Sequence, residues 1–215
     1  MIRGVSKFFS LCILSSVGFS PLVQAGTSSA PEATINEKHL DGEHFYENRK
    51  EISLDSGALF SISGDNSYTI APILASFHWQ LDDVGLEGWR RGNTEFIFTG
   101  YYDQVVDGPE NRFVGGLFGP RYNFVQPGWK IVPYIEARVG FGFTDSSTVP
   151  AGAQGQDFCF TFAVSSGARY FITDQFSVSA AFWYQHWSNG GLSEPARDNN
   201  GLDTVGPMLG MNYAF

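Results

Sequence analysis

Cysteine is almost absent from this sequence, which holds two in 215 residues, Cys12 and Cys159. Cys12 lies in an N-terminal segment that we expect to be removed, so the remaining chain has one thiol and no intramolecular disulfide. Basic residues are also scarce, since 13 Lys and Arg stand against 22 Asp and Glu. Without a basic stripe to neutralise phosphates, the composition argues against a nucleic-acid-binding protein.

Long apolar runs are missing as well. Beyond the N-terminus no stretch approaches the roughly 18 consecutive apolar residues of a membrane-crossing helix, which excludes a helical membrane protein. The hydrophobic share is nevertheless 43%, and 16% of the residues are aromatic. This composition excludes disorder for most of the chain and indicates a single folded domain.

The N-terminus has the features of an export signal. Arg3 and Lys7 precede an apolar stretch from Phe8 to Phe19, and Val23-Gln24-Ala25 supplies small residues for cleavage. This order of charged, apolar and small residues is typical of a secretory signal. We therefore expect residues 1–25 to be a signal peptide that is removed after export.

Residues 26–50 are polar and have little periodicity. We interpret them as a flexible periplasmic leader, because such a composition cannot bury a core of its own. His39, Asp41, Glu43 and His44 lie close together within it, and a metal site is conceivable there. A solvated run is favoured on composition. The sequence therefore predicts no metal.

Residues 51–215 are dominated by a period of two, which is typical of β-strands. Turn sequences such as Gln-Pro-Gly and Asn-Gly-Gly interrupt this pattern at intervals. They leave eight predicted strands: Glu51–Gly64, Tyr68–Leu81, Asn93–Gln104, Arg112–Val125, Lys130–Asp145, Gln156–Ile172, Gln175–Ser188 and Leu202–Phe215.

The two faces of these strands differ in chemistry. In the fifth strand one face is apolar throughout, with Ile131, Pro133, Ile135, Ala137, Val139, Phe141 and Phe143. The opposite face holds charge and glycine, with Val132, Tyr134, Glu136, Arg138, Gly140 and Gly142. Arg121 and Arg169 share the polar face of their own strands, so we expect them to form an interior salt-bridge network with Glu136 and Arg138.

The length of the strands distinguishes a membrane barrel from a soluble sandwich, whose strands average about five or six residues. These segments are long enough for the 9 to 11 or so residues of a tilted membrane strand. The chain also ends on Tyr213-Ala214-Phe215, which resembles the assembly signal of bacterial outer-membrane barrels. The sequence thus predicts an all-β fold over residues 51–215, an eight-stranded antiparallel transmembrane β-barrel of the bacterial outer membrane. Phe215 would engage the barrel-assembly machinery.

The apolar face of the seventh strand continues outward into two polar residues, His186 and Ser188. Two positions on one strand face stand roughly 7 Å apart, within reach of a serine–imidazole contact. On the eighth strand Asp203 occupies the apolar face at the same outer end, and adjacent strands lie about 4.8 Å apart. Asp203 is therefore placed to orient the second nitrogen of His186.

A serine, a histidine and an acid are what nucleophilic acyl transfer requires, because serine is a weak nucleophile until an oriented base takes its proton. Asn189, Gly190 and Gly191 follow the serine and offer N–H donors for an oxyanion. The alternative is that His186, Trp187 and Ser188 belong to the interfacial belt in which Trp, Tyr and polar residues collect. Strand parity alone leaves both open.

These residues resemble the PagL-type lipid A 3-O-deacylases, also called acyloxyacyl-hydrolase-like outer-membrane proteins. The stretch His186-Trp187-Ser188-Asn189-Gly190-Gly191-Leu192 is similar to the family's His-x-Ser-Asn-x-Gly-Leu motif, and Pro195 with Asn199-Asn200-Gly201 is similar to its following loop. Pro133-Tyr134-Ile135-Glu136-Ala137, then Gly140, resembles a second family motif. The likeness runs from about Glu51 to Phe215, in the first half only as a pattern.

The resemblance implies a lipid-facing serine hydrolase that removes the ester-linked 3-hydroxyacyl chain at position 3 of lipid A, with no cofactor. His186 would be the base, Ser188 the nucleophile, and Asn189 with Gly191 the oxyanion neighbourhood. Family members often have Glu as the acid. Asp203 takes that place by parity, and Glu194 and Asp198 remain rivals.

Two further features concern partners. Arg90 and Arg91 are placed near the outer end of the second strand, where they could meet lipid A phosphates; an ordinary solvated loop is an equal alternative. Lipid A, or lipopolysaccharide, is the expected substrate, and a homodimer is left open. The rival functions are a non-catalytic barrel, structural or porin-like, and an acyltransferase on the same plan.

Overall fold

The computed structural model describes residues 44–63, 67–149 and 154–215. The expected signal peptide 1–25 lies outside the described residues, as do most of the expected leader and His39, Asp41 and Glu43. None of the helices in the described residues has the length and hydropathy that a bilayer crossing requires.

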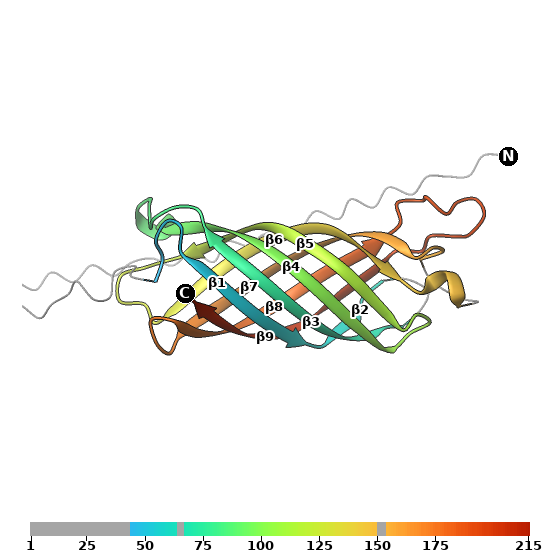
Figure 1. Ribbon diagram of the computed structural model, residues 1–215, viewed down its shortest axis with the longest axis horizontal. Helices are drawn as coiled ribbons and strands as arrows, with labels where there is room; N and C mark the ends of the chain where they lie inside the picture. The colour runs from blue at the N-terminus through green and yellow to red at the C-terminus, as the bar shows by residue number, and fades with distance from the viewer. Residues whose placement is uncertain (1–43, 64–66, 150–153) are drawn as a thin grey trace, which may run out of the picture. The chain divides into compact units, whose positions relative to one another are not determined.

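Nine strand segments form a closed antiparallel barrel (Figure 1). They are β1 Lys50–Gly57, β2 Leu59–Ser61, β3 Thr69–Gln80, β4 Gly92–Asp107, β5 Arg112–Phe124, β6 Ile131–Thr144, β7 Phe158–Phe171, β8 Phe176–Ser188 and β9 Leu202–Ala214. Two short 3-10 helices, η2 Gly88–Arg90 and η3 Ser146–Thr148, lie in connections. Each predicted strand is present to within a few residues.

The segments β1 and β2 are two halves of one strand. Both pair with β3 on one side and with β9 on the other, and the pairing continues from Gly57–Met208 to Phe60–Val205 in one register across Ala58. The pairing of the first strand with the last closes the sheet. The barrel is therefore eight-stranded, as the sequence predicts.

Exposure alternates along every long strand, because one face meets lipid and the other fills the barrel. On β6 the predicted apolar face is outward, with Ile135 and Phe141 each about half exposed. The opposite face is inward, and Glu136 and Arg138 are buried. An apolar outer wall around a filled interior is the arrangement of a small outer-membrane barrel.

The predicted interior network is confirmed. Glu136 accepts hydrogen bonds from Arg121 Nε at 2.7 Å and from Arg138 Nη2 at 2.8 Å. Glu95 lies 3.1 Å from Arg121, and Glu51 lies 3.1 Å from Arg169. These groups pair charge with charge inside the wall, which offsets part of the cost of burying each of them.

A second interior layer is apolar and lies towards the ends of β8 and β9 that are joined by residues 189–201. Trp187, Phe113, Leu59 and Leu202 belong to one buried cluster. The rings of Phe113 and Trp187 lie 5.1 Å apart. This layer supports from inside the part of the wall that carries His186 and Ser188.

The two ends of the barrel differ in their connections (Figure 1). The end that holds the C-terminus and the start of β1 also carries the short turns 125–130 and 172–175, together with the connection 81–91 that contains η2. The opposite end carries the connection 189–201 and the described parts, 145–149 and 154–157, of the connection between β6 and β7. Short turns belong to the periplasmic side and long loops to the outer side, so the candidate site lies at the outer rim.

Two expectations need correction. Arg90 and Arg91 lie at the periplasmic end, not at the outer end, because β3 descends towards them and the Val125 N–H donates to the Arg91 carbonyl at 3.0 Å. The last residues of the expected leader are packed: Phe45 is buried against Val125 and Val132. Residues 44–49 therefore belong to the base of the barrel.

Candidate active site

Strand β8 places its last residues alternately outward and inward. His186 and Ser188 lie on the outward face and are partly exposed, and Trp187 between them is fully buried in the interior. The buried indole anchors the strand. Because alternate side chains point to opposite faces, the histidine and the serine are both presented at the lipid-facing rim.

His186 and Asp203 are direct partners in the pairing of β8 with β9. Imidazole Nδ1 lies 2.6 Å from Asp203 Oδ1, and the two side chains are 27% and 28% exposed. A carboxylate at Nδ1 favours the tautomer that carries its proton there. Nε2 is then left unprotonated, which is the state that a general base requires.

The Asp203 carboxylate has two further donors. The Tyr184 hydroxyl lies 2.6 Å from Oδ1, and the Ser63 hydroxyl lies 2.5 Å from Oδ2. Tyr184 is two residues before His186 on the same face of β8, whereas Ser63 follows β2. Three donors on one carboxylate stabilise its charged form at a lipid-facing position, where an unpaired charge is costly.

The imidazole is confined by its neighbours. The Phe162 ring of β7 lies 5.1 Å from it, at an interplanar angle of 32°. On another side stands Gly201, where an added Cβ would be 3.5 Å from His186 Cε1. Gly201 has a φ of +58°, a conformation that suits glycine. The Phe162 ring therefore packs against the imidazole, and the glycine at position 201 leaves the space beside Cε1 unfilled by a side chain.

Ser188 Oγ accepts two hydrogen bonds, from Asn199 Nδ2 at 2.9 Å and from the Gly190 N–H at 3.1 Å. Both use the oxygen as acceptor, so its proton remains available to a base. A direct bond from Ser188 to His186 is not among the hydrogen bonds of the described residues. Catalytic contacts of this kind often tighten only when substrate binds.

Asn189 and Gly191, the expected oxyanion neighbourhood, are engaged in holding the loop together. The Asn189 amide is buried and donates to Ser193 Oγ at 2.7 Å and to the Gln154 carbonyl. The Gly191 N–H donates to Asn189 Oδ1 at 2.8 Å. In this arrangement the donors on Ser188 are Gly190 and Asn199, and the oxyanion role of Asn189 and Gly191 stays a prediction.

The two rival acids are placed differently from Asp203. Glu194 and Asp198 are exposed, and both lie in the connection between β8 and β9. The carboxylate that the structure brings to His186 is that of Asp203.

A family model matches the chain over residues 74–212, more than half of its length: Lipid A 3-O-deacylase (PagL). The chain belongs to the PagL family. The matched region contains His186, Ser188 and Asp203.

Solved structures agree with the fold of this PagL-family chain. The crystal structure of the outer membrane enzyme PagL is 19% identical, with a TM-score of 0.54 over 74% of this chain and 97% of that one. The crystal structure of Neisserial surface protein A is 15% identical, with a TM-score of 0.53 over 77% and 97%. At these identities the likeness concerns the barrel alone. No curated protein matches the chain in sequence.

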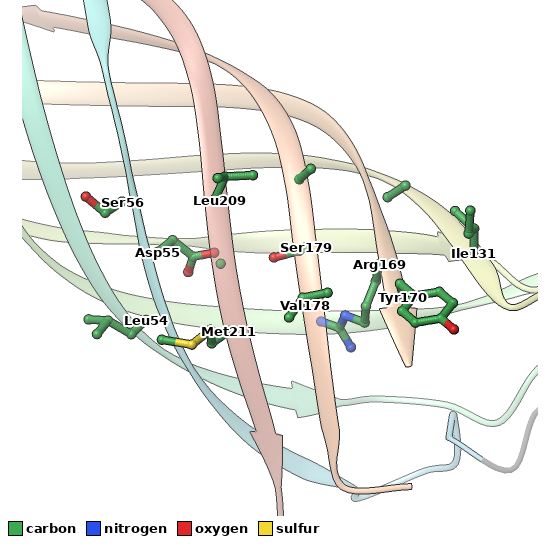
Figure 2. A pocket seen from close by; sticks show the side chains of 13 residues that line it. Leu54, Asp55, Ser56, Ile131, Arg169, Tyr170, Val178, Ser179, Leu209 and Met211 are labelled. Atoms are coloured by element: carbon green, nitrogen blue, oxygen red, sulfur yellow. The ribbon is translucent and has the colours of Figure 1, made fainter. Parts of the chain in front are cut away.

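A broad hollow on the wall of the PagL-family barrel lies away from this site. It has a volume of about 630 Å³ and runs over the wall from Leu54 and Met211 to Tyr170 and Ile131 (Figure 2). None of Ser188, His186 and Asp203 lines it. The candidate active site is therefore identified by the side chains of Ser188, His186 and Asp203, and this hollow does not mark it. Among the described residues no group of His, Cys, Asp and Glu has the arrangement of a metal site.

Three residues at the PagL-family site escaped the sequence reasoning: Ser63, Tyr184 and Asn199. Tyr184 shares the parity of His186, which could have indicated it. Asn199 belongs to a loop in which strand parity gives no direction, and Ser63 is 140 residues from the carboxylate that it contacts. No local pattern marks a contact of that range.

Proposed function

We propose that this protein is an outer-membrane serine esterase that hydrolyses the ester-linked 3-hydroxyacyl chain at position 3 of lipid A. The observation that supports it best is the Asp203–His186 pair, with Ser188 next on the same lipid-facing rim. A structural barrel has no need of a carboxylate, an imidazole and a hydroxyl on the lipid side, where polar groups are costly.

The first step is acyl transfer to the enzyme. Ser188 Oγ attacks the ester carbonyl carbon, and its proton passes to His186 Nε2. Asp203 stabilises the imidazolium that forms. When the tetrahedral intermediate collapses, the sugar oxygen leaves with the proton from His186, and the acyl chain remains as an ester of Ser188.

The second step frees the serine. A water molecule gives its proton to His186 and attacks the acyl-serine carbonyl carbon, and the 3-hydroxy fatty acid departs as Ser188 regains the proton. In both steps the carbonyl oxygen carries negative charge. The Gly190 N–H and the Asn199 amide, which contact Ser188 Oγ, are the donors that we assign to this charge.

The site suits a substrate that enters from the membrane. Ser188 is paired across the sheet with Phe160 of β7, and His186 with Phe162. Both phenylalanines face lipid and are about half exposed. The ester of a lipid in the outer leaflet could reach the serine laterally while its acyl chains stay against this wall.

The test is mass spectrometry of lipid A from cells that express the protein or Ser188→Ala, with assembly of each barrel checked by heat-modifiable gel mobility. We expect loss of one 3-hydroxyacyl chain, assigned to position 3 by fragmentation, only with the unmodified protein. Unchanged lipid A with an assembled barrel would contradict the proposal. A gain of an acyl chain would indicate the acyltransferase instead.

A further inference from the structure

A second pocket lies on the outer wall at the periplasmic end, far from the candidate active site. Its volume is about 490 Å³, and six residues line it: Trp89, Phe124, Gln126, Pro127, Trp129 and Pro133. Phe124 ends β5 and Pro133 lies near the start of β6, both on the outward face. The pocket therefore continues the lipid-facing wall to the level where hydrocarbon meets water.

Hydrogen bonds hold the two connections that form this pocket. The Arg91 guanidinium donates to the Val125 carbonyl at 2.6 Å, and the Val125 N–H donates to the Arg91 carbonyl at 3.0 Å. The Gln126 amide donates to the Gly88 carbonyl at 3.1 Å. The turn that carries Trp89 is thus tied to the turn that carries Trp129. Because the backbone of both turns is already held in place, less ordering is needed when the pocket is filled.

The connections 81–91 and 125–130 expose large apolar side chains, and one of these residues has an unfavourable backbone conformation. Leu86 has a φ of +59°, an uncommon conformation for a bulky residue, and is 62% exposed. Trp89 is 78% exposed and Trp129 is 53% exposed. Tryptophan collects at membrane interfaces because its ring is apolar and its N–H is polar. The exposed rings of Trp89 and Trp129 are thus of the kind found where hydrocarbon meets water.

Two cations are the sequence neighbours of the two tryptophans that line the pocket. Arg90 follows Trp89 and Lys130 follows Trp129, and both are exposed. In the described part of the chain neither side chain has an ion pair or a hydrogen bond, whereas Arg91 beside them is bound to Val125. The carboxylates Asp82 and Asp83 of the same connection accept hydrogen bonds from the backbone N–H groups of Thr94 and Glu47. Two exposed cations next in sequence to an apolar pocket match a lipid whose anionic head group adjoins its acyl chains.

We propose that this pocket binds a glycerophospholipid of the inner leaflet, with an acyl chain between Trp89 and Trp129 and the phosphate against Arg90 and Lys130. The location favours a lipid over a protein partner, since the pocket continues a wall that already contacts the bilayer. Arg90 and Lys130 give the pocket a preference for anionic lipid. This site is independent of the esterase at the outer rim.

The probe is a brominated phospholipid that quenches tryptophan fluorescence. The protein is reconstituted in phosphatidylcholine vesicles that contain equal fractions of brominated phosphatidylglycerol or brominated phosphatidylcholine. Trp183 and Trp187 are buried, and Trp79 is exposed elsewhere on the wall. Quenching by lipid bound in the pocket is therefore measured as the difference between the unmodified protein and the variants Trp89→Phe and Trp129→Phe.

We expect phosphatidylglycerol to be preferred about fivefold for each cation that contacts it. Arg90→Gln with Lys130→Gln should abolish this preference, and Lys50→Gln, an exposed cation at the same end, should retain it. Added salt should weaken the preference of the unmodified protein. Equal quenching by both lipids, or a preference that survives the double substitution, would contradict the proposed site. The two tryptophans would then be part of an ordinary interfacial aromatic belt. Deacylation by the double variant should be unchanged.

Discussion

His186 and Asp203 stand directly opposite each other on β8 and β9, with imidazole Nδ1 2.6 Å from the carboxylate Oδ1. Both residues lie on the outward face of their strands. A histidine–carboxylate pair, which is costly to expose to lipid, therefore forms part of the wall of this membrane barrel. The pair defines a direction, because Nε2 is turned away from Asp203 and is free to serve a hydroxyl.

Ser188→Ala and His186→Asn should each lower deacylation on the order of 10⁴-fold or more while the barrel still assembles. The double variant should be no worse than either single one, because members of one catalytic unit act together. The measurement is release of 3-hydroxy fatty acid from purified lipid A, alongside the folded band in a gel. Rapid hydrolysis by an assembled Ser188→Ala barrel would refute the mechanism.

Asp203→Asn should lower kcat by about 10⁴-fold, since an amide cannot stabilise the imidazolium or fix its tautomer. Glu194→Gln and Asp198→Asn should leave the rate near that of the unmodified protein, because both acids are exposed in the connecting loop. Initial rates for the three variants decide between them. If Glu194→Gln is the damaging change, the assignment of Asp203 is wrong.

Tyr184→Phe should lower kcat about ten- to a hundredfold, because it removes one hydrogen bond to a charged carboxylate. The KM should change little, since the hydroxyl contacts Asp203 and need not contact substrate. Ser63→Ala should act in the same direction, and Ser63→Thr, which keeps the hydroxyl, should restore activity. Tyr213→Phe, an outward tyrosine near the other end of β9, is the matched control. If Tyr184 has a purely structural role, Tyr184→Phe will impair assembly of the barrel and will not lower kcat at an unchanged KM.

Asn199→Ala should lower kcat by about 10²-fold or more if its amide offsets charge on the reacting oxygen. The neighbouring Asn200→Ala, which changes an exposed side chain, should have little effect. Single-turnover kinetics on lipid A would separate a slower acylation step from weaker binding. Equal rates for the two variants would remove Asn199 from the chemistry.

Glu136→Ala should destabilise the barrel by about 3–5 kcal/mol, because it leaves Arg121 and Arg138 buried without their shared carboxylate. The urea concentration at which the compact gel band disappears would report the change. Glu194→Ala removes an exposed carboxylate and should leave the midpoint in place. An unshifted midpoint for Glu136→Ala would show that the interior network contributes little to stability.

Strand alternation made most of the fold predictable. The wall of this barrel has lipid on one side and, on the other, a packed interior with a charged layer and an apolar layer. Alternate residues of each strand therefore differ in their surroundings, and in most strands their chemistry shows which face is which. The same rule put His186, Ser188 and Asp203 on one rim. Alternation could not place Arg90 and Arg91, because they lie in a connection outside the strands. Their end of the barrel is decided by the direction in which β3 crosses the membrane.

The sequence by itself determined which residues face lipid, how many strands cross the membrane and which side chains could share one face. Tertiary structure decided the contacts that depend on closure: Ser63 on Asp203, Asn199 on Ser188 and Phe45 against Val125. The physical reason is range. Alternation is a property of neighbouring residues, whereas these contacts exist only once pairing of the first strand with the last has fixed the register around the whole barrel.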